Sequence, residues 1–98
     1  MIEGKTKTGF KYKVDERIRT DWRLVKAIAE SQSDDEGIKL KAVVTMIQLV
    51  LGSQEELLMQ HIMKKNNGYI PMEVMNAEIT EIIQSLPNSK NWYSLPGV

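Results

Sequence analysis

The sequence predicts a mainly α-helical domain of the α+β kind: a small N-terminal β-hairpin, about four helices and a flexible C-terminal tail. Apolar and basic residues alternate with period two over residues 10–14, which is the pattern of a half-buried strand. Later segments repeat apolar residues at helical spacing. The chain has 98 residues and no cysteine. We therefore expect a single domain with one modest core over residues 1–87, followed by a tail over residues 88–98.

The hairpin is predicted within residues 2–14. Phe10, Tyr12 and Val14 occupy alternate positions and share one face of a strand, while the lysines between them face the other way. Residues 2–5 can pair back across the intervening turn. Because a lone hairpin is marginally stable in water, we expect this one to lie against the helices or against a partner chain.

The first helix is predicted over residues 22–30, where apolar residues recur at helical spacing. Asp15 and Asp21 are both plausible N-caps, because a short carboxylate side chain can accept a hydrogen bond from a first-turn N–H. The stretch at 16–20 forms either a separate turn or an extension of this helix. A polar, acidic loop over residues 31–37 follows.

The second helix is predicted over residues 38–51, the most hydrophobic segment of the chain. Its apolar residues cover more than one face, so we expect burial on much of its circumference. Its many β-branched residues make a strand a competing prediction. The length of the segment favours a helix, and Gly52 is a natural residue to end it.

Start and stop signals define the last two helices. Ser53 and Glu56 have the spacing of a capping box, which predicts that the third helix begins at Ser53 and runs to about residue 65. Pro71 suits the first position of the fourth helix, and Pro87 closes it. The fourth helix carries an amphipathic stripe that consists of Met75, Ile79, Ile82, Ile83 and Leu86.

The composition excludes several kinds of chemistry. The absence of cysteine excludes a disulfide scaffold, a thiolate nucleophile and a cysteine-based metal site. The lone His61 lies on the apolar stripe of the third helix, which favours a core or edge residue over a catalytic one. The glycines are isolated, and the acids at 34–36 lack the spacing of a calcium loop. We expect no catalytic residue, no metal and no cofactor.

Two observations predict a cytoplasmic protein without a membrane partner. No apolar run follows the first charges, as it would in a signal peptide. The longest apolar stretch, Ala42–Leu51, is far shorter than the ~20 residues that a membrane-spanning helix needs.

The formal net charge of zero conceals an uneven distribution. Residues 1–26 contain eight basic and four acidic residues, so the remaining residues contain five basic and nine acidic ones. This basic first quarter is either a face that meets an acidic partner or nucleic acid, or simply the solvent side of a hairpin and a helix.

The methionines raise the question of a protein-binding surface. They are either gap-fillers in the core or part of a surface that adapts to partners. Leu58, Met59, Ile62 and Met63 make a face that is wider than one small neighbour needs, which predicts a homo-oligomer or a partner groove.

A helix–turn–helix DNA-binding protein is the main alternative from another class. Its recognition helix would be residues 72–86, which carry three glutamates and no lysine or arginine. Because these acids would repel phosphates, we expect nucleic-acid binding to be the weaker interpretation, limited to the basic N-terminal region.

Several short motifs follow one another along residues 1–91. The chain opens with Ile2-Glu-Gly-Lys-Thr-Lys-Thr-Gly-Phe10 and Lys11-Tyr-Lys-Val-Asp15. A Trp-containing helix ending in Ala-Ile-Ala-Glu30, a hydrophobic helix ending in Leu-Val-Leu-Gly52 and the motif Gly68-Tyr-Ile-Pro71 come next. A final amphipathic helix and Ser-Lys-Asn91 complete the series. This order resembles the small tail assembly chaperones of siphophages and prophages from Gram-positive bacteria.

The resemblance implies a non-enzymatic protein of an infected or lysogenic bacterial cell. Such chaperones bind the tape-measure protein, keep its helical segments soluble and help tail-tube subunits to polymerise around it. Members of the family form ring-like or helical oligomers, and many also exist in a longer, frameshifted form. The ending of this chain, residues 92–98, is more hydrophobic than the family pattern.

Two hypotheses about binding follow. Leu58, Met59, Ile62 and Met63, with Met75 nearby, form part of the surface for the partner or for self-association. The tail engages a neighbouring subunit through Trp92 and Tyr93. The alternatives are a small DNA-binding regulator and a structural subunit of the virion.

Overall fold

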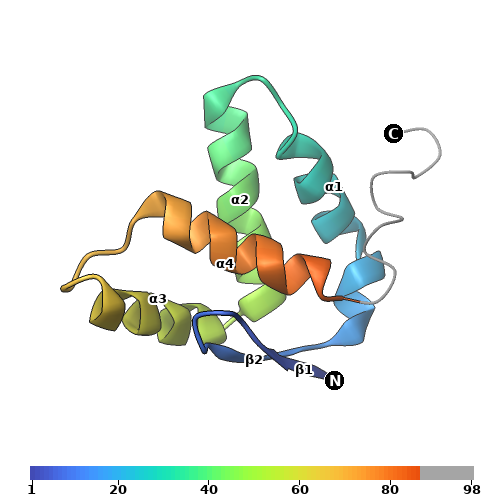
Figure 1. Ribbon diagram of the computed structural model, residues 1–98. Coiled ribbons are helices and arrows are strands. Elements are labelled where there is room, and N and C mark those ends of the chain that lie inside the picture. The colour runs from blue at the N-terminus through green and yellow to red at the C-terminus, as the bar shows by residue number, and fades with distance from the viewer. Residues whose placement is uncertain (87–98) are drawn as a thin grey trace.

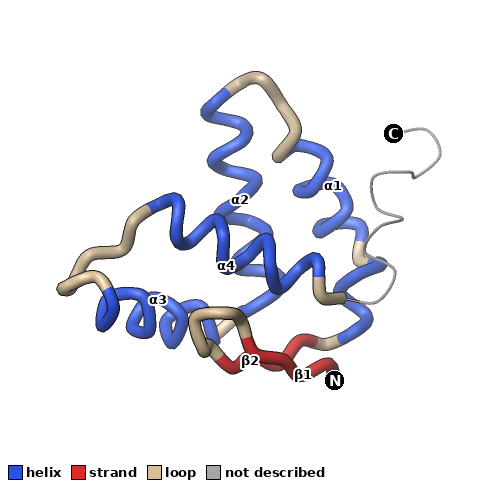
Figure 2. Tube along the Cα trace, viewed as in Figure 1, coloured by secondary structure: helices blue, strands red, loops and turns tan. Residues whose placement is uncertain are grey.

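The computed structural model describes residues 1–86, and within them the fold is mainly helical with a β-hairpin at the N-terminus, as predicted (Figures 1 and 2). The tail predicted at residues 88–98 lies outside the described residues. The elements in chain order are β1 (Ile2–Lys5), β2 (Lys11–Val14), the 3₁₀ helix η1 (Glu16–Thr20), α1 (Trp22–Glu30), α2 (Glu36–Leu51), α3 (Gln54–Lys65) and α4 (Met72–Gln84).

The two strands pair antiparallel, with Ile2 opposite Val14 and Lys5 opposite Lys11. The predicted inner face is confirmed, because Phe10, Tyr12 and Val14 are all buried in the core. The hairpin lies against helices of its own chain, below α4 and at one end of α3 in Figure 1.

A side chain of α3 covers one edge of this hairpin. The Lys13 N–H donates to Gln54 Oε1 at 2.8 Å, and Gln54 Nε2 donates to the Lys13 carbonyl at 2.6 Å. The amide group thus satisfies both backbone groups of Lys13, as a neighbouring strand would do.

Two aspartates begin the next two elements, and both N-cap predictions are confirmed. Asp15 accepts a hydrogen bond from the Arg17 N–H, and Asp21 accepts one from the Arg23 N–H, each at 2.9 Å. Asp21 has extended backbone dihedrals between η1 and α1, so residues 16–20 form a separate turn and do not extend the helix.

The same two aspartates hold their neighbouring arginines. A hydrogen bond from the Arg17 side chain is the main cause that lowers the pKa of Asp15 to about 2. Arg23 lowers the pKa of Asp21 to about 2 in the same way. The ordinary pKa of an aspartate carboxyl is 3.8, so the folded-state pKa values of both groups are depressed, and both favour the folded state only while they are ionised.

We therefore predict that Asp15 and Asp21 add an acid-sensitive contribution to the free energy of unfolding. This contribution is fully present above pH ~4 and disappears as the pH falls toward ~2. Denaturant titrations measure this contribution in the double variant that combines Asp15→Asn with Asp21→Asn. Its free energy of unfolding should decline less than that of wild type as the pH falls through this range, because asparagine still caps a helix but does not titrate. The exposed loop variant Asp34→Asn is the control, and a wild-type decline in the double variant would contradict the prediction.

The hydrophobic segment forms the helix α2 and no strand, as its length predicted. The helix begins two residues earlier than expected, because Asp35 accepts hydrogen bonds from the N–H groups of Gly37 and Ile38. It ends at Gly52, whose φ of +55° is favourable for glycine.

The capping box predicted at Ser53 is wrong. Ser53 has helical dihedrals (φ −65°, ψ −15°), and its side chain makes no capping hydrogen bond. An N-cap side chain reaches the first-turn N–H groups from an extended backbone, which Ser53 does not have. The following helix, α4, begins one residue after Pro71.

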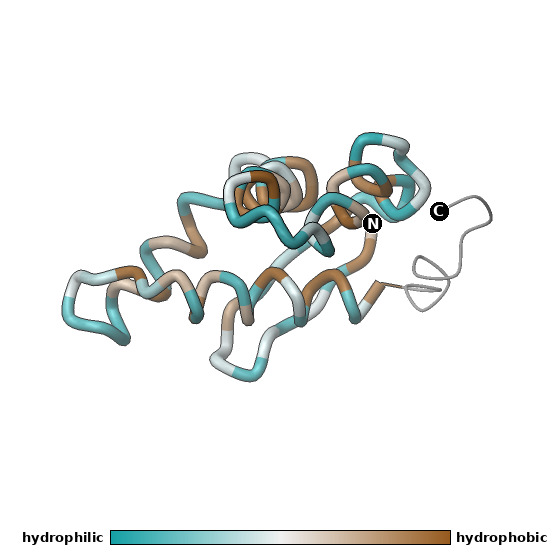
Figure 3. The backbone as a smooth tube through the Cα atoms, turned by 90° about the horizontal axis from the view of Figure 1, so that it is seen from above, coloured by the Kyte–Doolittle hydropathy of each residue, from teal (hydrophilic) through white to brown (hydrophobic). Residues whose placement is uncertain are grey.

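The helices form two arms that meet over a shared core. α1 and α2 run antiparallel as one arm, while α3 and the start of α4 form the other, from which α4 crosses α2 (Figure 1). In Figure 3, hydrophobic and hydrophilic stretches alternate along the tube. The most deeply buried large side chains come from the hairpin, α1, α3 and α4. They are Val14, Leu24, Leu58, Ile62, Ile79 and Ile82.

The bend between α2 and α3 measures 110°. Within residues 1–86, no individual helix has both the length and the apolar character required to cross a membrane. Only this bent pair, when its two helices are counted together, meets both requirements.

Candidate functional site

Two residues of the predicted binding surface lie in the core. Leu58 is 0% exposed and Ile62 is 1% exposed. They are one helical turn apart on the face of α3 that packs toward the rest of the domain, so no partner can reach them without unfolding the helix. The prediction that Leu58 and Ile62 are available for binding is therefore corrected.

The other predicted residues have different positions. Met59 and Met63 are half-buried on a flank of α3, next to the buried face. Met75 is half-buried on α4 and packs against the core. Trp92 and Tyr93 lie outside the described residues. Among the members of the set that the structure describes, Met59, Met63 and Met75 keep some exposed surface.

Other apolar side chains are exposed, and three of them, Ile38, Leu40 and Val44, lie on α2. Leu40 and Val44 are exposed and, being four residues apart, share one face of the helix. The prediction that this helix is buried on much of its circumference holds only for its second half, because residues 36–41 are all exposed. In Figure 1, α3 follows the C-terminal end of α2 and α4 crosses the helix, so the N-terminal end of α2 extends beyond both of them.

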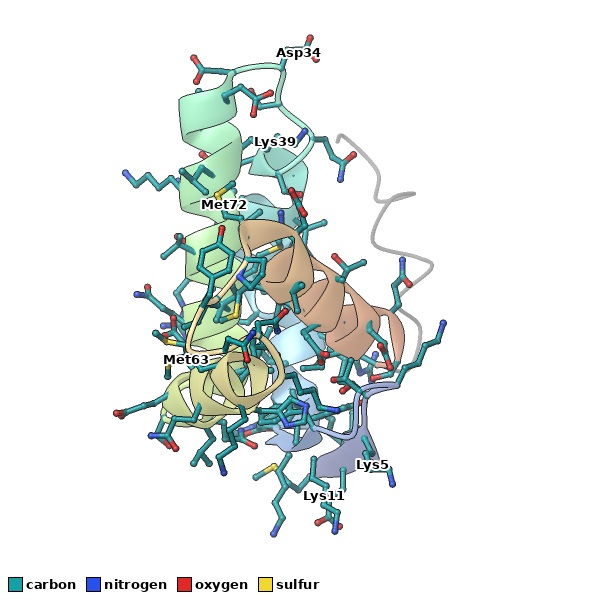
Figure 4. The ribbon with its side chains drawn as sticks, turned by 60° about the vertical axis from the view of Figure 1, so that its left-hand side comes forward. Lys5, Lys11, Asp34, Lys39, Met63 and Met72 are labelled. Atoms are coloured by element: carbon teal, nitrogen blue, oxygen red, sulfur yellow. The ribbon has the colours of Figure 1, made fainter. Side chains whose placement is uncertain are left out.

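The start of α4 adds to this surface. Met72 is 64% exposed, and Tyr69, in the loop before it, is also exposed. In Figure 4, Met72 lies beside the middle of α2, and Met63 lies below it on the side of the molecule that faces the viewer. We call Leu40, Val44, Tyr69 and Met72 the α2–α4 corner.

The excess of apolar residues on α2 is the sequence signal that could have found this corner. Ten apolar residues between 38 and 51 cover more than one face, which is more than one buried stripe requires. The same pattern fits a fully buried helix, and the chain is too small to enclose α2 on all sides.

A polar cluster joins the turn of the hairpin to α3 and α4. Glu78 is 3% exposed, and its Oε1 accepts a short hydrogen bond from the Thr8 hydroxyl. Thr8 Oγ1 also lies 3.1 Å from His61 Nε2, and the ring of His61 lies 5.7 Å from that of Phe10. The other carboxylate oxygen of Glu78 is buried and has no hydrogen-bond partner in the described part of the chain.

This arrangement holds the hairpin turn against α3 and α4, and we call Thr8, His61 and Glu78 the clamp. The hydroxyl lies between the imidazole and the carboxylate, whereas a nucleophilic triad needs the imidazole in the middle to accept the hydroxyl proton. The Lys7 N–H donates to Glu81 Oε2 at 2.8 Å and fastens the same turn to α4. No group of three or more metal-binding side chains occurs within residues 1–86.

The basic residues of the first quarter are largely on the surface. Three of them pair with interleaved acids, in the pairs Lys13–Glu3, Arg17–Asp15 and Arg23–Asp21. This arrangement fits the solvent side of a hairpin and a helix, with local charge neutralisation, better than one uniform basic face.

Comparisons of this chain with protein-family models, with curated proteins and with solved structures found no match.

Proposed function

We propose that the protein is a non-enzymatic phage tail assembly chaperone that binds apolar helical segments of a tape-measure protein. In this role it also assists the polymerisation of tail-tube subunits and self-associates while it acts. The observation that carries the proposal is the exposure of the apolar side chains that define the α2–α4 corner, two on α2, one on α4 and one in the loop before α4.

The chemistry of the corner suits this task. A long helical protein waiting for assembly exposes apolar stripes, and an apolar surface between helices can cover such a stripe by helix-in-groove packing. Met72, together with the half-buried Met63 and Met75, supplies flexible side chains that adapt to different sequences.

The surroundings of the corner suit reversible binding. Charged residues such as Lys39 and Glu73 border its apolar side chains in the sequence and are exposed. A modest apolar patch with a polar rim is typical of transient contacts, and a chaperone must leave when the tail is complete.

Co-expression with a fragment of the tape-measure protein from the same phage or prophage tests the proposal. We expect wild type to keep the fragment in the soluble fraction and the variant Val44→Lys with Met72→Lys to lose this effect, because two buried charges would oppose helix docking. Leu57→Lys is the matched control, since Leu57 is another exposed apolar residue, on α3.

Two outcomes would contradict the proposal. One is a fragment that stays insoluble with wild type. The other is salt-dependent binding of the protein to nonspecific DNA without any effect on the fragment, which would favour the DNA-binding regulator.

A further inference from the structure

A second surface lies on another flank of α2, in the groove that α2 forms with α1. The groove encloses about 390 Å³. Its floor is apolar and made of small side chains, among them the buried Ala27 and Ala42, with Leu49 at one end. Ile38, which is 46% exposed, forms part of the wall at the end near the α1–α2 loop.

The rim of this groove is cationic. Arg23 and Lys26 of α1 and Lys41 of α2 line it, against the single acid Glu30. Arg23 is satisfied by Asp21, with 2.8 Å between Nη2 and Oδ2. Neither Lys26 nor Lys41 makes a salt bridge within residues 1–86, so two cations border the apolar floor against the one carboxylate of Glu30.

Shape and charge together define what fits here. A groove between two antiparallel helices accepts a third helix, whose side chains enter between the ridges of the other two. An apolar floor favours an apolar seam, and the lysines favour carboxylates beside that seam. The same face of a second copy would oppose cations to cations and is disfavoured.

We infer that the α1–α2 groove binds an amphipathic helix of a partner protein whose apolar seam is flanked by glutamate or aspartate. The carboxylates lie against Lys26 and Lys41, and the apolar seam lies over Ala27, Ala42 and Ile38. This site is separate from the α2–α4 corner and does not depend on the proposed function.

Synthetic helical peptides test the inference on the full chain. Two peptides share one seam of leucine and alanine, and glutamates flank the seam in one whereas lysines flank it in the other. Calorimetric titration should give at least about tenfold tighter binding for the glutamate peptide. The difference should shrink between about 50 mM and about 300 mM salt, because exposed charges are screened.

Charge reversal locates the binding. Lys26→Glu with Lys41→Glu should reverse the preference toward the lysine peptide, while Lys64→Glu with Lys65→Glu, which makes the same charge change on exposed residues of α3, should keep it. Circular dichroism confirms that each variant is folded. Equal binding of both peptides to wild type, or equal effects of the two double variants, would overturn the inference.

The peptide-binding experiment can fail or succeed independently of the test of the proposed function. The peptides require no phage protein, so they bind the groove even if the chain is not a chaperone. Val44→Lys with Met72→Lys should leave peptide binding unchanged. Loss of peptide binding in that variant would place the site at the corner and overturn the inference.

Discussion

Leu58→Ala is expected to lower the free energy of unfolding by about 3 kcal/mol, the typical cost of removing a fully buried leucine side chain. Leu58 is completely buried on α3 as part of the core cluster, and the surrounding side chains can fill only part of the cavity. A domain of this size has a total stability of roughly 5–10 kcal/mol, so the midpoint of thermal unfolding should fall by more than about 10 °C.

Met59→Ala provides the comparison within the same helix. Met59 is half-buried and lies outside the buried face, so its truncation should lower the free energy of unfolding by less than about 1 kcal/mol. Urea denaturation followed by circular dichroism measures both variants. If Leu58→Ala and Met59→Ala lowered the free energy of unfolding by the same small amount, the core position of Leu58 would be contradicted.

Gly4→Ala has the second largest expected effect, a loss of about 2 kcal/mol, because a new methyl group would overlap a fixed ring. A Cβ at Gly4 would lie 2.5 Å from Tyr12 Cζ and equally near its hydroxyl oxygen. Tyr12 is opposite Gly4 in the hairpin and is buried, and its hydroxyl lies 2.7 Å from Ser85 Oγ. The ring cannot move aside without losing this hydrogen bond and its packing.

A double-mutant cycle isolates the cause. In a Tyr12→Val background the ring is absent, so Gly4→Ala should become neutral or stabilising, since alanine orders a strand at a lower entropic cost than glycine. The same penalty in both backgrounds, measured by urea denaturation, would contradict the predicted overlap.

Local patterns in the sequence were sufficient to predict the elements of the fold. Period-two alternation identified the buried face of β2, and Asp15 and Asp21 identified the starts of η1 and α1. Each of these signals is contained within a few residues, so it can be recognised without knowledge of the tertiary contacts. The capping box failed because the short α2–α3 connection holds Ser53 in a helical conformation, which a spacing rule cannot detect.

The site was harder to predict, because exposure depends on what packs against each helix. The apolar pattern of α3 correctly identified Leu58 and Ile62 as one face, but it could not tell that the hairpin and α4 cover this face. The clamp joins Thr8 to His61 and Glu78, each more than fifty positions away in the sequence, so no local pattern reveals it. The same holds for the α2–α4 corner, which depends on where α4 crosses α2.

The most direct test of the central claim is an equilibrium titration of the purified protein with a purified helical fragment of the tape-measure protein. We expect wild type and Leu57→Lys to bind with similar affinity, and Val44→Lys with Met72→Lys to bind at least about tenfold more weakly, while all three unfold at similar urea concentrations. Absence of binding by wild type, or unchanged affinity in the double variant, would contradict the claim that the α2–α4 corner receives the partner helices.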